Sequence, residues 1–181
     1  PCMFSRLDRN SYDSRIAQSQ ENALDIIQRS GVEVTWIDNN SSCKGVCVRV
    51  KSQTIEPTKS NPLCDGHYCF DEVLVDELAA TLAKSNAKHQ LVVLHMIGSH
   101  GPTYYRRYPE KDSKFLPDCP RSDIQNCSSE QLINTYDNTI AYTDLVLSKL
   151  INLLKDSKAD DKSLLYVSDH GESLGEKGLT M

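Results

Sequence analysis

The chain has 181 residues, of which 39% are hydrophobic and 25% charged, and its formal net charge is −5. This composition fits one globular domain with a sizeable core, excludes a disordered or fibrous chain, and argues against nucleic acid as the principal partner. The longest apolar runs, such as residues 91–97, are too short to cross a bilayer and no leader pattern opens the sequence, so these residues are expected to be soluble as they stand.

The first third of the chain contains one predicted helix and one predicted strand. Four apolar residues recur there at helical spacing: Ile16, Ala23, Leu24 and Ile27. Together with a stop at Gly31 they predict a helix over about residues 11–30, followed by a strand at residues 32–37. Residues 38–70 are rich in turn formers and include two prolines, so an elaborated loop is predicted there.

The rest of the chain repeats this alternation. Residues 71–84 carry apolar side chains on one face and predict a second helix, and residues 91–97 predict a second strand. After a long loop, Ser128 and Gln131 form a capping box that predicts a helix running to about residue 155. Residues 163–167 predict a third strand. Alternating helices and short apolar strands indicate an α/β fold with a mostly parallel sheet, flanked by helices on both faces.

Polar residues follow each of the three predicted strands. They lie at residues 38–40, 98–101 and 168–172. In parallel sheets the ligand site lies beyond the carboxyl ends of the strands. We therefore expect a functional site at this edge.

Six of the seven cysteines fall into close pairs: Cys43 with Cys47, Cys64 with Cys69, and Cys119 with Cys127. Each pair lies in a polar, loop-like stretch, and the spacings do not suit a zinc knuckle, so three local disulfides and an oxidising compartment are predicted. The alternative is a set of free buried thiols. Cys2 is left over, and its partner is expected upstream of Pro1, so the chain is expected to be a fragment.

Asp169 and His170 leave the third predicted strand together, and Gly171 lets the backbone turn after them. One carboxylate oxygen and one imidazole nitrogen near a common point suit zinc, but a catalytic zinc needs a third protein ligand from elsewhere. The alternative is that Asp169 caps a helix and His170 is a surface side chain.

Other candidates are His100, which lies between two glycines, and Lys44, which lies inside the Cys43–Cys47 loop after Asn40 and Ser41. His100 fits a second metal ligand or a partner for phosphate oxygens, or else a solvent-facing histidine. Lys44 could grip an anionic headgroup or be an ordinary solvated lysine. His95, inside the apolar strand, is expected to be a hydrogen-bonded core histidine.

One loop segment combines aromatic and basic side chains: Tyr104, Tyr105, Arg106, Arg107 and Tyr108. They could rim a cleft for a lipid or sugar phosphate. We prefer the interpretation that they pack a long loop.

Taken together and in order, these motifs resemble those of the lipid A phosphoethanolamine transferases, a family that includes the mobile colistin-resistance enzymes. The motifs are the Pro-Cys-Met-Phe-Ser start, the Cys-Lys-Gly loop at residues 43–45, the Gly-Ser-His-Gly-Pro-Thr-Tyr-Tyr run at 98–105, residues 134–139, and the Ser-Asp-His-Gly-Glu-Ser-Leu-Gly-Glu run at 168–176. They span nearly the whole chain.

The resemblance implies an alkaline phosphatase/sulfatase-like fold and zinc-dependent transfer of phosphoethanolamine from phosphatidylethanolamine to lipid A, which weakens polymyxin binding. It implies that Asp169 and His170 bind Zn²⁺, and that Asn40, Ser41, Lys44 and His100 bind substrate, His100 also serving catalysis. The nucleophilic threonine of the family, which carries the headgroup as a covalent intermediate, is expected upstream of Pro1.

On this interpretation, residues 1–181 are the central part of a periplasmic catalytic domain, incomplete at both ends. A membrane domain that is not in this chain would anchor it to the bacterial inner membrane, and we expect a monomer. The fragment alone is expected to be inactive. The alternatives are a phosphatase or sulfatase-type hydrolase of the same superfamily and a non-catalytic module that binds lipid headgroups.

Overall fold

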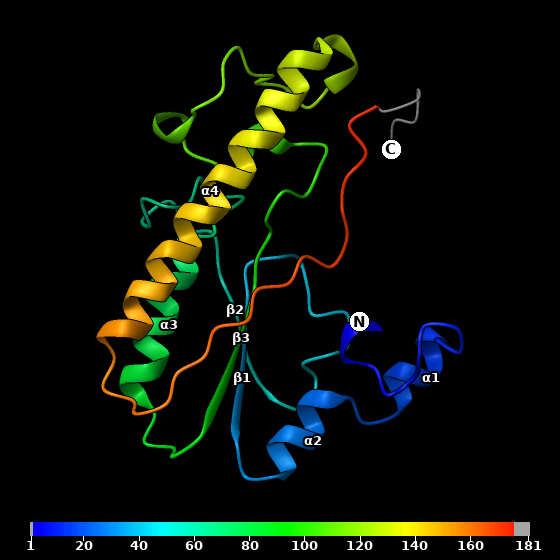
Figure 1. The fold of residues 1–181 in the computed structure, drawn as a ribbon, viewed down its shortest axis with the longest axis vertical. Coiled ribbons are helices and arrows are strands. Elements are labelled where there is room, and N and C mark those ends of the chain that lie inside the picture. Colours follow the sequence, from blue (N-terminus) through cyan, green and yellow to red (C-terminus); the bar gives the residue numbers. More distant parts are fainter. Residues whose placement is uncertain (1, 176–181) are drawn as a thin grey trace.

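The computed structural model describes residues 2–175 of the chain (Figure 1). The α-helices are α1 (Ser14–Ser19), α2 (Ala23–Arg29), α3 (Val73–Lys84) and α4 (Ser129–Asp156). The strands are β1 (Glu33–Asp38), β2 (Lys51–Thr54) and β3 (Gln90–His95). Short 3-10 helices are η1 (Cys2–Phe4), η2 (Tyr104–Arg106), η3 (Glu110–Asp112) and η4 (Ile124–Asn126).

The three strands form one parallel sheet in the order β2-β1-β3. The register pairs Asp38 at the end of β1 with Thr54 on one side and His95 on the other. The carboxyl ends of all three strands therefore meet at one edge. This confirms the predicted α/β class and the parallel arrangement.

Helices cover both faces of the sheet, with α2 on one side and α3 and α4 on the other (Figure 1). Because side chains alternate along a strand, Val34 and Trp36 of β1 pack with Leu24 of α2, whereas Ile37 packs with Leu74 of α3. Both helix layers bury apolar side chains against the central strand, as predicted.

The long helix α4 begins where the sequence predicted. The side chain of Ser128 accepts a hydrogen bond from the amide of Gln131, and the side chain of Gln131 accepts one from the amide of Ser128. The apolar face of α4 buries Val146 and Leu150 in a cluster that includes Leu78 of α3. In the part of the chain that the structure describes, none of the helices has both the length and the apolar character needed to cross a bilayer.

The predicted helix over residues 11–30 is divided into α1 and α2. Asn22 causes the break, because its side chain caps Leu24 and also donates to the carbonyl of Val46 at 2.8 Å. Asp25 completes a capping box with the amide of Asn22. These tertiary hydrogen bonds start a new helix within one apolar pattern.

Two further predictions about strands were wrong. Strand β2 lies inside the predicted loop region, and all four of its residues are exposed, so no apolar pattern marks it. Residues 163–167 are irregular, and Leu165 is 89% exposed. The apolar run there was interpreted as a buried strand, but a strand needs a hydrogen-bonded neighbour, and the described sheet contains only β1, β2 and β3.

All three predicted disulfides are present: Cys43–Cys47, Cys64–Cys69 and Cys119–Cys127. Cys2 is exposed and is the one free cysteine among residues 2–175. That its partner lies upstream stays a prediction.

Candidate functional site

Two strand ends are joined at the carboxyl edge of the sheet by the side chain of Asp38. Its Oδ2 lies 3.2 Å from Nδ1 of His95 and accepts a 3.0 Å hydrogen bond from the indole of Trp36. Its Oδ1 accepts from the amide of Asn40, whose own side chain reaches the carbonyl of Met96 at 3.4 Å. His95 is therefore a hydrogen-bonded histidine, as expected, and Asn40 is tied to the segment that leads to His100.

Asp71 is the second carboxylate that binds loops at the carboxyl edge of the sheet. It is 4% exposed, and its carboxylate accepts hydrogen bonds from the side chain of Asn39 at 2.7 Å and from the amides of Ile97 at 2.9 Å and Gly98 at 2.7 Å. Burial raises the pKa of Asp71, and these hydrogen bonds oppose that rise. One buried carboxyl thus fixes the loops after β1 and β3 relative to each other.

His100 follows directly in a compact turn, in which its amide donates to the carbonyl of Ile97 at 3.2 Å. Its Nδ1 lies 2.8 Å from the carbonyl of Gly101 and must donate to it, because a carbonyl oxygen only accepts. Nε2 is then left to accept or coordinate. Gly101 is required by close packing, since a Cβ there would lie 2.6 Å from the hydroxyl of Tyr104.

The aromatic and basic segment after His100 packs the loop. Tyr104 and Tyr108 are each 4% exposed, and burial, with a smaller effect of Glu172 and Asp118 respectively, raises the pKa of each to about 12. The preferred interpretation of this segment is confirmed for these two rings.

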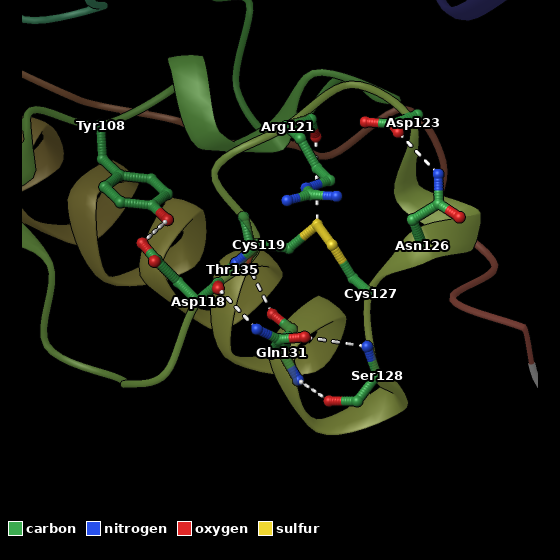
Figure 2. Close-up of a disulfide and its surroundings, with 10 residues drawn as sticks. All are labelled: Tyr108, Asp118, Cys119, Arg121, Asp123, Asn126, Cys127, Ser128, Gln131 and Thr135. Atoms are coloured by element: carbon green, nitrogen blue, oxygen red, sulfur yellow. Dashed lines mark hydrogen bonds between the residues drawn. A yellow bond between two sulfur atoms is a disulfide. The ribbon is translucent and has the colours of Figure 1, made fainter.

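Three polar side chains of α4, those of Thr135, Asn138 and Thr139, hold the loops of residues 99–119 in place. Thr135 accepts from the amide of Cys119 at 2.6 Å, Asn138 binds the backbone of Lys114 and Phe115, and the hydroxyl of Thr139 lies 2.6 Å from that of Ser99. Figure 2 shows Thr135 beside the Cys119–Cys127 disulfide and the capping box of α4. The motif at residues 134–139 therefore acts as a scaffold for the candidate site.

Ser41 and Lys44 lie on the segment that continues from Asn40. Both are exposed, and Lys44 has a left-handed φ of 47° inside the Cys43–Cys47 loop. Non-glycine residues rarely adopt such a φ, and it is found most often at functional sites and tight turns. The disulfide loop presents the ammonium group of Lys44 to solvent.

Asp169 and His170 lie on the exposed segment after α4 and not at the end of a strand, contrary to the prediction. Their side chains are 79% and 59% exposed, and Oδ2 of Asp169 lies 3.9 Å from Nε2 of His170. Nδ1 of His170 donates to the carbonyl of Gly171 at 2.8 Å. That hydrogen bond, with a smaller effect of Asp169, raises the pKa of His170.

These two side chains fit half of a zinc site. Metal-bound histidines commonly donate their second ring N–H to a backbone carbonyl, as Nδ1 of His170 does, and this leaves Nε2 as the nitrogen that could bind a metal. Among residues 2–175, however, no three His, Cys, Asp or Glu side chains come together as a metal cluster. A third ligand would have to come from outside the described residues.

The segment around Asp169 is linked to the loop of His100 by a hydrogen bond, in which the hydroxyl of Tyr104 donates to Glu172 at 3.4 Å. The structure therefore brings Asn40 and His100 to one edge of the sheet, and Tyr104 connects the segment of Asp169 and His170 to the loop of His100.

The sequence did not identify Asp71, which was assigned to the start of a helix. Arg107 was named only as a residue of a packed loop or of a cleft rim, and its contact with the backbone of His100 was not predicted. For Asp71 the only local sign is a charged residue at the border of an apolar element, which most often marks a helix end.

A family model described as Sulfatase matches residues 1–180. The chain is 51% identical, over 99% of its length and 33% of the relative's, to phosphoethanolamine transferase EptA of Salmonella typhimurium. It is 42% identical to phosphatidylethanolamine transferase Mcr-1 of Escherichia coli, over 99% of the chain and 34% of that protein. The chain thus spans about a third of the length of these relatives.

Among solved structures, the integral membrane protein lipooligosaccharide phosphoethanolamine transferase A from Neisseria meningitidis matches with a TM-score of 0.90 and 45% identity. The match covers 100% of this chain and 34% of that one. The resemblance inferred from the motifs and the fold class are both confirmed.

Proposed function

The chain belongs to the sulfatase family, and on that premise we propose that it is part of a phosphoethanolamine transferase that modifies lipid A. The donor would be phosphatidylethanolamine and the acceptor a phosphate group of lipid A. The names of the similar proteins support both substrate classes, since they mention phosphoethanolamine, phosphatidylethanolamine and lipooligosaccharide.

The observation that carries the proposal is the meeting of the Asn40 and His100 loops at the carboxyl edge of the sheet. The Asp38–His95 pair and the buried carboxyl of Asp71 hold these loops together. Asn40 and His100, two of the four proposed substrate-binding residues, thus lie where parallel α/β sheets bind ligands.

The roles of the individual residues follow from their chemistry. The side-chain amide of Asn40, through the N–H that does not donate to Met96, and the hydroxyl of Ser41 would donate hydrogen bonds to phosphate oxygens. The ammonium group of Lys44 would neutralise their charge. His100 would present Nε2 to the transferred group, as a donor when protonated, because Nδ1 is occupied by the carbonyl of Gly101. These side chains bind and orient the donor headgroup.

Asp169 and His170 would hold Zn²⁺, completed by ligands outside the described residues. When bound, zinc would supply Lewis-acid chemistry at the phosphoryl group. In the proposed reaction a threonine outside this chain forms a bond to the donor phosphorus while the bond to diacylglycerol breaks. A lipid A phosphate oxygen then displaces the threonine.

The three disulfides support a location in the periplasm, where such bonds persist. Together with the integral membrane relative, they support a catalytic domain held at the bacterial inner membrane and facing the periplasm. The phenotype would be resistance to polymyxins, because an added amine makes lipid A less anionic.

The test is to express the full product of the gene that encodes these residues in a susceptible Gram-negative host and to weigh lipid A by mass spectrometry. We expect lipid A to gain the mass of phosphoethanolamine, and Asp169→Ala to abolish the gain and lower the zinc content of the purified protein. Asp160→Ala, at another exposed carboxylate on the same segment, is the matched control and should keep both. Unmodified lipid A in the wild type would contradict the proposal.

The match to the sulfatase model keeps a hydrolase as the second candidate. A hydrolase would release a free phosphate or sulfate product in the same cells and leave lipid A unchanged.

A further inference from the structure

The turn that carries His100 is held at both ends by buried charges. At its start, the carboxylate of Asp71 accepts from the amides of Ile97 and Gly98. At its end, Nε of Arg107 donates to the carbonyl of His100 at 2.9 Å. An anion thus holds the first amides of the turn, and a cation holds its last carbonyl.

Arg107 is itself held in place. It is 7% exposed, and its Nη2 donates to the hydroxyl of Thr103 at 2.9 Å. Its guanidinium carbon lies 5.5 Å from the centre of the Tyr68 ring. Tyr68 belongs to the loop closed by the Cys64–Cys69 disulfide. The position of Arg107 is therefore fixed by two separate loops.

Burying the guanidinium of Arg107 opposes the stability of the fold, so packing alone does not explain this residue. Burial lowers its pKa, and Nη1 is buried without a hydrogen-bond partner among residues 2–175. A buried unpaired donor opposes stability, and such local conflicts are expected where function requires a residue. The charge of Asp71 offsets part of the cost, since each group favours the charged form of the other.

We propose that Arg107 is a positioning residue that, together with Asp71, fixes the backbone of His100 and so the placement of its imidazole against the substrate. This rests on the proposed function, in which His100 contacts the transferred group. Arg107 acts through His100 and does not touch the substrate. Because a displacement of about 1 Å at a reacting group can cost about a hundredfold in rate, a small shift of this turn would have a large effect.

The experiment compares Arg107→Lys with Arg15→Lys in the full gene product. Arg15 is a matched control because its side chain is 92% exposed on α1. We expect Arg107→Lys to lower kcat for phosphoethanolamine transfer about tenfold to a hundredfold and to change KM less than about threefold. A role in binding alone would raise KM and spare kcat.

Hydrogen–deuterium exchange of residues 96–101 gives a readout that does not depend on activity. Arg107→Lys should exchange faster than wild type in this segment only, whereas Arg15→Lys should not. If wild type transfers nothing, the proposed function fails, and the exchange measurement still tests whether Arg107 holds the backbone of His100 in place.

Thr103→Val keeps the proposal falsifiable if Arg107→Lys does not fold. It removes one anchor of the guanidinium, and we expect a smaller loss of kcat, about twofold to fivefold, with faster exchange of the same segment. Unchanged kcat and unchanged exchange in the folded variants would overturn the proposal.

Discussion

The carboxylate of Asp38 lies 3.2 Å from the imidazole of His95, across the last pair of the register between β1 and β3. The Asp38 side chain is 4% exposed, whereas that of His95 is 32% exposed. The other oxygen of Asp38 accepts from the amide of Asn40, so the same group serves the sheet and the proposed substrate loop.

The first prediction is that Asp38→Asn lowers the free energy of unfolding by about 1–3 kcal/mol, because the new amide group would face at least one donor that the carboxylate now accepts from. Chemical denaturation measures the change. Asp144→Asn, at an exposed position of α4, should stay within about 0.5 kcal/mol of wild type. Equal unfolding midpoints for the two variants would contradict the prediction.

Asn138 is the subject of the second prediction. It is fully buried, its Oδ1 accepts from the amides of Lys114 and Phe115 at 2.7 and 2.8 Å, and its Nδ2 donates to the carbonyl of Phe115 at 2.9 Å. Asn138→Ala would leave buried groups unpaired and should lower the free energy of unfolding by about 3 kcal/mol.

Asn134→Ala is the control for Asn138→Ala, since it removes a similar side chain one turn earlier on α4. Asn134 donates one exposed hydrogen bond, to the carbonyl of Pro117, so its loss should cost about 1 kcal/mol or less. A larger effect at Asn134 than at Asn138 would refute the assignment of Asn138 as the anchor of this loop.

The third prediction concerns the pH dependence of stability. Arg49 donates to the buried carboxylate of Asp25 at 2.8 Å, and this hydrogen bond is the largest cause of a lowered pKa of Asp25. Because the pKa is lower in the folded state, the pair stabilises the fold at pH values above the unfolded pKa of about 4. That stabilisation is lost as the pH falls through the folded pKa.

Arg49→Met should therefore lower the free energy of unfolding by about 1 kcal/mol at neutral pH. The difference from wild type should shrink as the pH falls from about 4 through the lower pKa of the folded state, below which Asp25 is protonated in both states. Thermal unfolding across this pH range measures it. Arg9→Met, at an exposed position, should show no such convergence. A difference that stays constant with pH would argue against the Asp25 pair.

The fourth prediction separates the charge of Lys44 from its backbone conformation. Lys44→Ala and Lys44→Gly both remove the ammonium group, but glycine adopts the φ of 47° without strain. If charge matters, both variants should raise KM for phosphatidylethanolamine about tenfold, a change typical of a lost charged contact. Lys88→Ala, at another exposed lysine, should leave KM unchanged. A KM near the wild-type value in Lys44→Gly but not in Lys44→Ala would mean that the backbone conformation of the loop matters and the charge does not.

The sequence predicted those elements whose signals are local. The start of α4 was found because Ser128 and Gln131 lie next to it in sequence, and the disulfides because the paired cysteines are close. Strand β2 was not found, since its exposed residues form a strand only through pairing with β1. The run at residues 163–167 shows the converse, because an apolar pattern does not specify a pairing partner.

The candidate site divides in the same way. Asn40 and His100 could be identified because each follows a strand, and parallel strands bring their ends together. Asp71 could not, because its hydrogen bonds with Ile97 and Gly98 cross 26 and 27 positions of the chain. Long-range hydrogen bonds of this kind depend on how α3 packs against the sheet.

The three disulfides join residues only four, five and eight positions apart, so each closes a small loop and none ties distant elements together. By loop-closure entropy each contributes roughly 2–3 kcal/mol, less than a long-range crosslink would. Yet these loops carry Lys44, Tyr68 and the amide of Cys119 that Thr135 binds. Reduction of the disulfides is therefore expected to lower the activity of the site while the sheet and the packing of α3 against α4 persist. The redox state of the compartment would then affect activity under conditions in which the domain is still folded.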